Sequence, residues 1–367
     1  MPGAAASAHH TRPLNELSGD DAPRFGAKSA SLGELLRAGI SVPPGFALST
    51  AAFDQFVDES QLRDTIEPAL AGAATGDVDA VGAASRVIAE AMRCAPVPES
   101  VRAEVSRRYD ELEAQVGAGS PPVAVRSSAL GEDSQDATFA GQQDTYLWVR
   151  GADDVCAAIR DCWASLYSPP AISYRARLGA TGAERPAMGV TVQLMVDAVI
   201  SGVMFTCNPV SGDPSMVAIN ASWGLGLAVV GGEVTPDDYL VSKVTREVVR
   251  EHVGAKSVQY VPDPDPGGSG TVRVDVPEQR RRQRCLDDQA LQALVDLGHR
   301  VQAHFGSHQD IEWAIARTEA EPDRLFVVQS RPVTAVPKRK PISPAASALS
   351  LVMGTFGAGH QPAEEEA

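Results

Sequence analysis

The sequence predicts an α+β fold, in which helices and strands occupy separate stretches of the chain. The clearest helix signal is the spacing of three and four residues between apolar positions from 98 to 116. Three apolar, β-branched runs between residues 187 and 222 are separated by turn residues and predict strands of a mixed or antiparallel sheet. Two further runs, 310–315 and 325–332, flank a charged turn and predict a hairpin.

The remaining elements follow from local signals. The runs VAVR (123–126) and TYLWV (145–149) are rich in β-branched and aromatic residues, which favours strands. Asp153 can cap one helix, and a second helix stops at Gly179. Another helix is predicted from Asp287 to Phe305. Residues 263–270 (DPDPGGSG) predict a flexible loop, and both ends, 1–16 and 337–367, predict disordered tails.

Composition excludes several classes of function. The 32 Lys and Arg against 47 Asp and Glu give a net charge of −15, which disfavours nucleic-acid binding. No apolar run is long enough to cross a membrane and no signal peptide is evident, so we expect a cytoplasmic protein without membrane contact. The cysteines are odd in number and widely spaced, which predicts reduced and mostly buried thiols; they are Cys94, Cys156, Cys162, Cys207 and Cys285.

The final hairpin carries the most informative polar residues. Side chains alternate along a strand, so Asp310 and Glu312 are expected on one face, and Val327, Gln329 and Arg331 share a face of the partner strand. The hairpin can therefore place Glu312 opposite Gln329 with Arg331 beside them. Oxygen ligands suit Mg²⁺, and a guanidinium suits phosphate oxygens. The alternative is a surface hairpin with solvated charges.

A second candidate is the loop that follows Arg126. Its small residues allow backbone N–H groups to surround a phosphate near Thr138, Phe139, Ala140 and Gly141, with Arg126 as a fixed cation. An ordinary turn is the alternative for any single glycine-rich segment.

A third candidate is Lys28 in FGAKSASLGELLRAG, at the first turn of a predicted helix, where its ammonium can reach a phosphate. The tetrapeptide GAKS occurs again at 254–257 without a comparable helix, so the tetrapeptide alone is weak support. The sequence contains no P-loop, no GxGxxG, no GxSxG and no HExxH motif.

Five collinear blocks resemble one family. They are residues 25–50, 123–149, 192–212, 220–241, and 309–315 with 326–335. Together they resemble the N-terminal ATP-grasp domain of phosphoenolpyruvate synthase and pyruvate phosphate dikinase, which also occurs in rifampin phosphotransferases. The resemblance runs from Leu17 to Ala335.

The resemblance implies an ATP-grasp fold with ATP between two lobes, 17–190 and 191–336. It implies that the enzyme passes the β-phosphoryl group of ATP to a histidine and releases AMP and phosphate. By position, it implies phosphate contacts from Lys28, Arg126 and Arg331. It also makes Glu312 and Gln329 ligands of Mg²⁺.

The resemblance further implies that Gln193 to Val196, including Met195, is a hinge that holds adenine through backbone groups. The loop from Thr138 to Gly141 would be a lid over the phosphates.

Two departures from the family pattern affect the expected function. Leu227 stands where the family usually has glutamate, which puts one polar contact in the cleft in doubt. His360 lies in the predicted tail without the motif of a phosphorylated histidine, so we expect the acceptor histidine on a separate protein that carries a swivelling domain. Two alternatives stay open: a rifampin phosphotransferase-like module acting on a small alcohol, and a non-catalytic nucleotide-binding regulatory protein.

Overall fold

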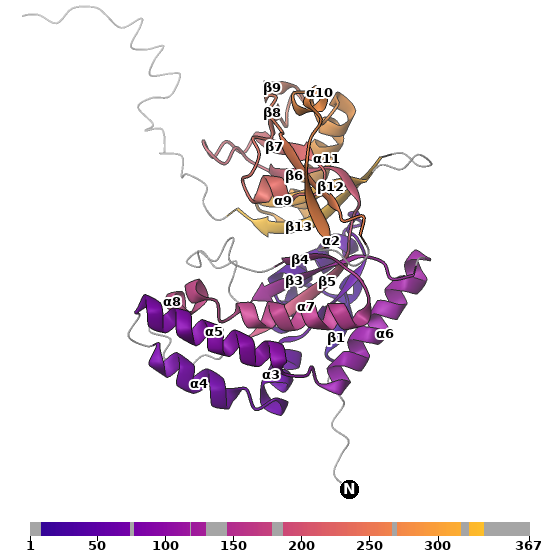
Figure 1. Cartoon of the computed structure of the whole chain (residues 1–367). Helices are drawn as coiled ribbons and strands as arrows, with labels where there is room; N and C mark the ends of the chain where they lie inside the picture. Colours follow the sequence, from indigo (N-terminus) through magenta and orange to yellow (C-terminus); the bar gives the residue numbers. More distant parts are fainter. Residues whose placement is uncertain are drawn as a thin grey trace, which may run out of the picture.

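The computed structural model describes residues 9–73, 77–117, 119–129, 145–177, 186–265, 270–316 and 323–333. Helices and antiparallel sheets make up this part of the chain, which confirms the predicted α+β class. Figure 1 shows an N-terminal lobe of helices around one sheet and a C-terminal lobe built on a second sheet.

The N-terminal lobe holds a five-stranded antiparallel sheet in the order β1-β2-β5-β3-β4. Its strands are β1 (Thr11–Pro13), β2 (Gly45–Leu48), β3 (Val123–Ala129), β4 (Thr145–Val149) and β5 (Met188–Leu194). The lobe also contains α3 (Thr50–Glu59), α4 (Arg63–Gly72), α5 (Val78–Cys94), α6 (Glu99–Val116), α7 (Ala152–Ser165) and α8 (Pro169–Arg177). The predicted helix at 98–116 and the predicted strands at 123–126 and 145–149 are confirmed by α6, β3 and β4. Trp163 of α7 is fully buried against Phe53 and Phe56 of α3.

The C-terminal lobe holds a six-stranded sheet in the order β13-β12-β6-β7-β8-β9. Its strands are β6 (Ala198–Phe205), β7 (Met216–Trp223), β8 (Asp237–Ser242), β9 (Val248–His252), β12 (Gln309–Ala316) and β13 (Arg324–Pro332). The helix α11 (Asp288–Phe305) is capped by the Asp287 carboxylate and ends at Gly306, whose φ of 67° a glycine adopts without strain. The lobe also contains α9 (Leu227–Val230), α10 (Glu278–Arg281) and a separate hairpin of β10 (Val258–Pro262) and β11 (Thr271–Asp275).

The first helices join the two lobes. Short turns η1 (Leu14–Glu16) and η2 (Gly19–Asp21) lead into α1 (Ala22–Phe25) and α2 (Ala27–Arg37). Leu32 and Leu35 of α2 belong to the same buried apolar cluster as Trp313 of β12. The Ser31 hydroxyl donates to the Ser330 carbonyl of β13 at 2.9 Å. The N-terminal segment therefore packs directly on the C-terminal sheet.

Three sequence predictions need correction. The three runs between 187 and 222, expected in one sheet, are divided between two, because β5 ends at Leu194 in the N-terminal sheet and β6 begins at Ala198 in the C-terminal sheet. The lobe boundary consequently lies at 195–197, not between 190 and 191. Residues 11–16, expected in a tail, form β1 and η1, since pairing with β2 and burial of Leu14 stabilise a segment too short to show a period.

All five cysteines are free thiols and four of them are buried, as predicted. Strands β8 to β11 were not predicted from the sequence, because apolar and polar residues alternate in them only over short stretches. Among the described residues, no helix has the length and apolar character needed to cross a membrane.

Candidate functional site

A cavity of about 550 Å³ lies between the lobes, a volume that suits a small-molecule ligand. Strands β3 and β5 line it from the N-terminal lobe, and α9, β12 and β13 line it from the C-terminal lobe. Six residues predicted from sequence line it: Arg126, Gln193, Met195, Val196, Glu312 and Gln329. Chain positions more than 200 residues apart thus meet in one space.

The β12–β13 hairpin places its polar pair as predicted. Glu312 pairs directly with Gln329, and Asp310 pairs with Arg331. A bulge after Glu312 shifts the register, so that Trp313 pairs with Val327.

This bulge corrects one sequence prediction. Val327 does not share the face of Gln329, because it is fully buried in the core. The extra residue, Val328, lines the cavity instead, and its carbonyl accepts a hydrogen bond from Arg126 Nη1 at 3.0 Å. A bulge often redirects side chains in this way, and strict alternation does not predict it.

Arg126 lines the cavity, and its Nε is fully buried without a hydrogen-bond partner among the described residues. A buried donor without a partner costs free energy, which a shift of the guanidinium toward an anion in the cavity would remove.

Arg331 and Lys28 do not line the cavity. Arg331 Nε contacts Asp310 Oδ2 at 2.8 Å, and burial raises the pKa of Asp310 against the opposing effect of that guanidinium. Lys28 lies in the first turn of α2, as predicted, and its Nζ donates to the Ser127 carbonyl at 3.0 Å. Lys28 is therefore held beside the strand that carries Arg126.

Gly26 fixes where α2 begins. Its φ is 81°, and an added Cβ would lie 2.1 Å from Ser128 Oγ. The same hydroxyl accepts from the Lys28 backbone N–H at 3.1 Å. Only glycine fits this close approach, which sets the position of Lys28 relative to β3.

The predicted hinge is the connection between the sheets. The N–H groups of Leu194 and Met195 donate to the carbonyls of Pro44 and Pro122 at 2.8 and 2.9 Å. The buried Gln193 side chain donates to the Pro43 carbonyl at 3.3 Å, so its amide group has a structural contact. Among the described residues, the Val196 N–H donates no backbone hydrogen bond.

A cluster of apolar side chains forms the end of the cavity next to Met195 and Val196. Its members are Ala198, Leu225, Ala314, Trp148, Met195, Val196, Tyr260 and Val328. We call these residues the hinge cluster. Sequence reasoning missed Trp148, Leu225 and Tyr260, because their contact depends on the β10–β11 hairpin, where the Leu225 N–H donates to the Tyr260 carbonyl at 2.9 Å.

The wall formed by α9 is apolar at its first residue, since Leu227 lines the cavity. Leu227 thus offers the cavity an alkyl side chain and no polar group at this position. The predicted lid residues Thr138, Phe139, Ala140 and Gly141 lie outside the described residues, as does His360.

The described residues of the cavity supply only some of the ligands that a metal ion would need. The described residues contain no group of three or more His, Cys, Asp or Glu side chains arranged for a metal ion. The Glu312 carboxylate and the Gln329 amide oxygen are two hard donors on one wall, which fits Mg²⁺ completed by phosphate oxygens and water.

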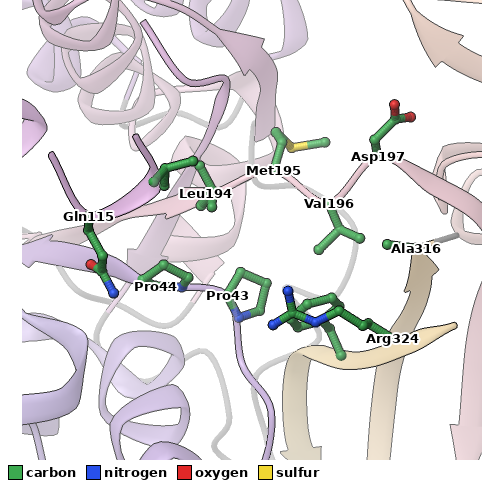
Figure 2. A pocket seen from close by; sticks show the side chains of 11 residues that line it. Pro43, Pro44, Gln115, Leu194, Met195, Val196, Asp197, Ala316 and Arg324 are labelled. Atoms are coloured by element: carbon green, nitrogen blue, oxygen red, sulfur yellow. The ribbon is translucent and has the colours of Figure 1, made fainter. Parts of the chain in front are cut away.

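A second cavity of about 470 Å³ lies on the other side of the hinge and shares Leu194 to Val196 with the first. Figure 2 shows Pro43, Pro44 and Gln115 of the N-terminal lobe and Arg324 of the C-terminal lobe around it. It contains none of the residues predicted to bind phosphate or magnesium. We call it the back cavity.

Comparison with known proteins gives the family. Residues 22–348 match the pyruvate phosphate dikinase AMP/ATP-binding domain, and the chain belongs to this family. It is 39% identical over 346 residues to a probable phosphoenolpyruvate synthase of Staphylothermus marinus, covering 89% of this chain and 41% of the relative. It is 37% identical over 358 residues to the phosphoenolpyruvate synthase of Pyrococcus furiosus, covering 88% and 43%.

A probable phosphoenolpyruvate synthase of Methanocaldococcus jannaschii is 38% identical over 327 residues, covering 89% of this chain and 27% of the relative. The chain thus spans less than half the length of these three relatives. The resemblance inferred from five motif blocks is confirmed, and the family description makes this an AMP/ATP-binding domain.

Proposed function

We propose that this chain is the ATP-binding phosphotransferase module of a phosphoenolpyruvate synthase-like system, with an ATP-grasp fold. The observation that carries the proposal is the shared cavity, which is lined by Arg126, by the paired Glu312 and Gln329, and by the hinge. A triphosphate nucleotide requires these three kinds of group: a cation, metal-binding oxygens and an apolar slot with backbone edges.

ATP is proposed to lie with adenine in the hinge cluster, next to the backbone of Met195 and Val196. Its phosphates extend toward Arg126 and the wall formed by Glu312 and Gln329. Magnesium, when bound there, would neutralise phosphate charge. This orientation is supported by the apolar character of one end of the cavity and the charged character of the other.

Lys28 and Arg331 are proposed to complete the phosphate site. Lys28 Nζ would leave the Ser127 carbonyl, whereas Arg331 would reach the γ-phosphate with its terminal guanidinium nitrogens while its Nε keeps the contact with Asp310 Oδ2. Catalysis would then rest on positioning and charge neutralisation.

The reaction proposed transfers the β-phosphoryl group to a histidine nitrogen. Its balance needs one water: ATP, water and histidine give phosphohistidine, AMP and phosphate. Among the described residues no histidine lines the cavity. We therefore propose that the acceptor histidine comes from a swivelling domain on a separate protein. The ATP requirement and the free thiols support a cytoplasmic location.

The test combines the purified chain, Mg-ATP and a separately produced histidine-bearing swivelling domain of the phosphoenolpyruvate synthase type. AMP release and acid-labile phosphate on the added domain are expected, and neither should form without it. Arg324→Ala in the back cavity is the matched control and should leave both unchanged.

The position of Leu227 favours one competing function, a non-catalytic nucleotide-binding regulatory protein. ATP binding without AMP formation, with several such domains offered, would support it. AMP formation with a small alcohol in place of the protein would instead support the rifampin phosphotransferase-like alternative.

A further inference from the structure

We propose that Glu233 is the residue that recognises the ribose hydroxyls of the nucleotide, so that the cavity selects ribonucleotides over deoxyribonucleotides. This inference rests on the proposed function. The described lining of the cavity contains two acidic side chains, Glu312 and Glu233. Glu312 faces Gln329 at the charged end, whereas Glu233 follows α9 in a different wall.

The Glu233 carboxylate is held in position by the β10–β11 hairpin. Tyr260 donates its hydroxyl to Oε1 at 2.8 Å, and Arg273 Nε contacts Oε2 at 3.3 Å. A carboxylate offers about four acceptor positions, so two donors leave room for a pair of hydroxyl groups. Fixing the carboxylate before the ligand arrives reduces the entropy lost on binding.

Tyr260 also places Glu233 next to the adenine end of the cavity. The Tyr260 ring belongs to the hinge cluster, and its backbone carbonyl accepts from the Leu225 N–H. Its hydroxyl is the group that contacts Glu233. The ribose is the next part of the nucleotide after adenine, so a carboxylate attached to the edge of this cluster lies where ribose hydroxyls are expected.

Other polar side chains on this part of the wall have internal contacts. The Ser201 hydroxyl donates to the Gly224 carbonyl at 2.6 Å, and the Gln193 amide donates to the Pro43 carbonyl. Leu227 offers no polar group. Glu233 is thus the best-placed acceptor for ribose hydroxyls near the hinge cluster.

The hairpin that holds Glu233 also reaches the N-terminal lobe. At Gly270, an added Cβ would lie 2.6 Å from the Leu147 carbonyl of β4. Leu147 itself lines the cavity. The hairpin that donates to the Glu233 carboxylate therefore contacts both lobes.

The experiment measures the affinity for ATP, 2′-deoxyATP and 3′-deoxyATP by calorimetry in the wild type, Glu233→Ala and Glu247→Gln. The wild type should prefer ATP to either analogue roughly tenfold or more, the factor given by about 1.4 kcal/mol for a hydroxyl contact. Glu233→Ala should reduce the preference to nearly one, because ATP loses two hydroxyl contacts whereas 2′-deoxyATP and 3′-deoxyATP each lose only one. Glu247, an exposed glutamate of the same lobe, is the control and should keep the wild-type ratio.

A second variant, Tyr260→Phe, removes one donor but keeps the carboxylate, and should lower the preference to an intermediate value. If Glu233→Ala leaves the ratio of ATP affinity to deoxy-analogue affinity at its wild-type value, Glu233 does not recognise the ribose hydroxyls. The proposal that the cavity binds ATP is not affected by that result. If the wild type binds none of the three, the proposed function itself fails. Retained 2′-deoxyATP binding in Glu233→Ala also shows that the variant is folded.

Discussion

The tetrapeptide GAKS occurs twice in this chain, and its two lysines have opposite environments. Lys28 lies half-buried in the first turn of a helix, beside the strand that carries Arg126. Lys256 is fully buried and forms an ion pair with Asp237, which is also fully buried. The Asp237 carboxylate further accepts from the backbone N–H groups of Gly254 and Cys285 at 3.0 and 2.7 Å.

The comparison teaches that the tetrapeptide GAKS does not by itself determine the role of its lysine, because the two copies lie in different structural environments. The first copy begins a helix next to a ligand cavity, while the second lies in a loop folded around a buried carboxylate. We expect the first lysine to affect phosphoryl transfer and the second to affect stability.

Lys256→Met should lower the free energy of unfolding by about 3 to 5 kcal/mol, because it leaves the buried Asp237 charge without its cation. Denaturant unfolding of both lysine variants measures the difference. Lys28→Met should change stability by less than about 1 kcal/mol, as a half-buried surface cation does. Equal losses in both variants would contradict the division.

The double variant Asp237→Leu, Lys256→Met refines this result. It removes both charges, so it should recover part of the stability lost in Lys256→Met. Recovery should be incomplete, because the N–H groups of Gly254 and Cys285 then lose their acceptor. A double variant less stable than Lys256→Met would show that the carboxylate contributes mainly through its backbone contacts.

Lys28→Met, Glu312→Ala and Arg331→Ala should each reduce AMP formation with an acceptor domain by roughly 100- to 1,000-fold, the cost of losing one group that stabilises developing charge. Thermal unfolding of each variant should stay close to the wild type. Unchanged turnover in the Glu312 and Arg331 variants would remove the proposed phosphate site.

Asp310→Asn should reduce turnover less than Arg331→Ala does, because Asp310 acts by holding the guanidinium through its Oδ2 contact. An amide keeps the shape and one acceptor but loses the charge. We expect a roughly tenfold loss, in line with one charge-assisted hydrogen bond. Steady-state kinetics of both variants provides the comparison; a larger loss in Asp310→Asn would mean that the carboxylate acts on the reaction directly.

The smallest effect concerns pH. Burial and the nearby Lys243 lower the pKa of His308 from its ordinary value of 6.5. Below that value the unfolded chain binds a proton that the folded chain does not, so stability should be complete above pH 6.5 and fall as the pH drops. His308→Gln should flatten the acid side of the stability profile. Burial and the same lysine also lower the pKa of His299. The His308→Gln variant should therefore still lose some stability as the pH falls.

Much of the site was predictable because its residues lie in short, regular segments. Strand alternation predicts that Glu312 and Gln329 meet, and the capping residue Asp287 with Gly306 predicts both ends of α11. The bulge that turns Val328 into the cavity was not predictable, since it depends on packing of Val327 against Trp313. The contacts of Tyr260 and Glu233 were missed because they join segments 27 residues apart through an irregular loop.

The sequence alone determined the α+β class, the family and four polar residues of the cavity, Arg126, Gln193, Glu312 and Gln329, because these follow from local periodicity and from residue types in order. Tertiary structure decided which of two identical tetrapeptides lies beside the strand of Arg126, where the chain passes from one sheet to the other, and which carboxylate contacts the hinge cluster. The physical reason is that burial and cross-lobe contacts are set by segments far apart in the chain, and no local pattern records their distances.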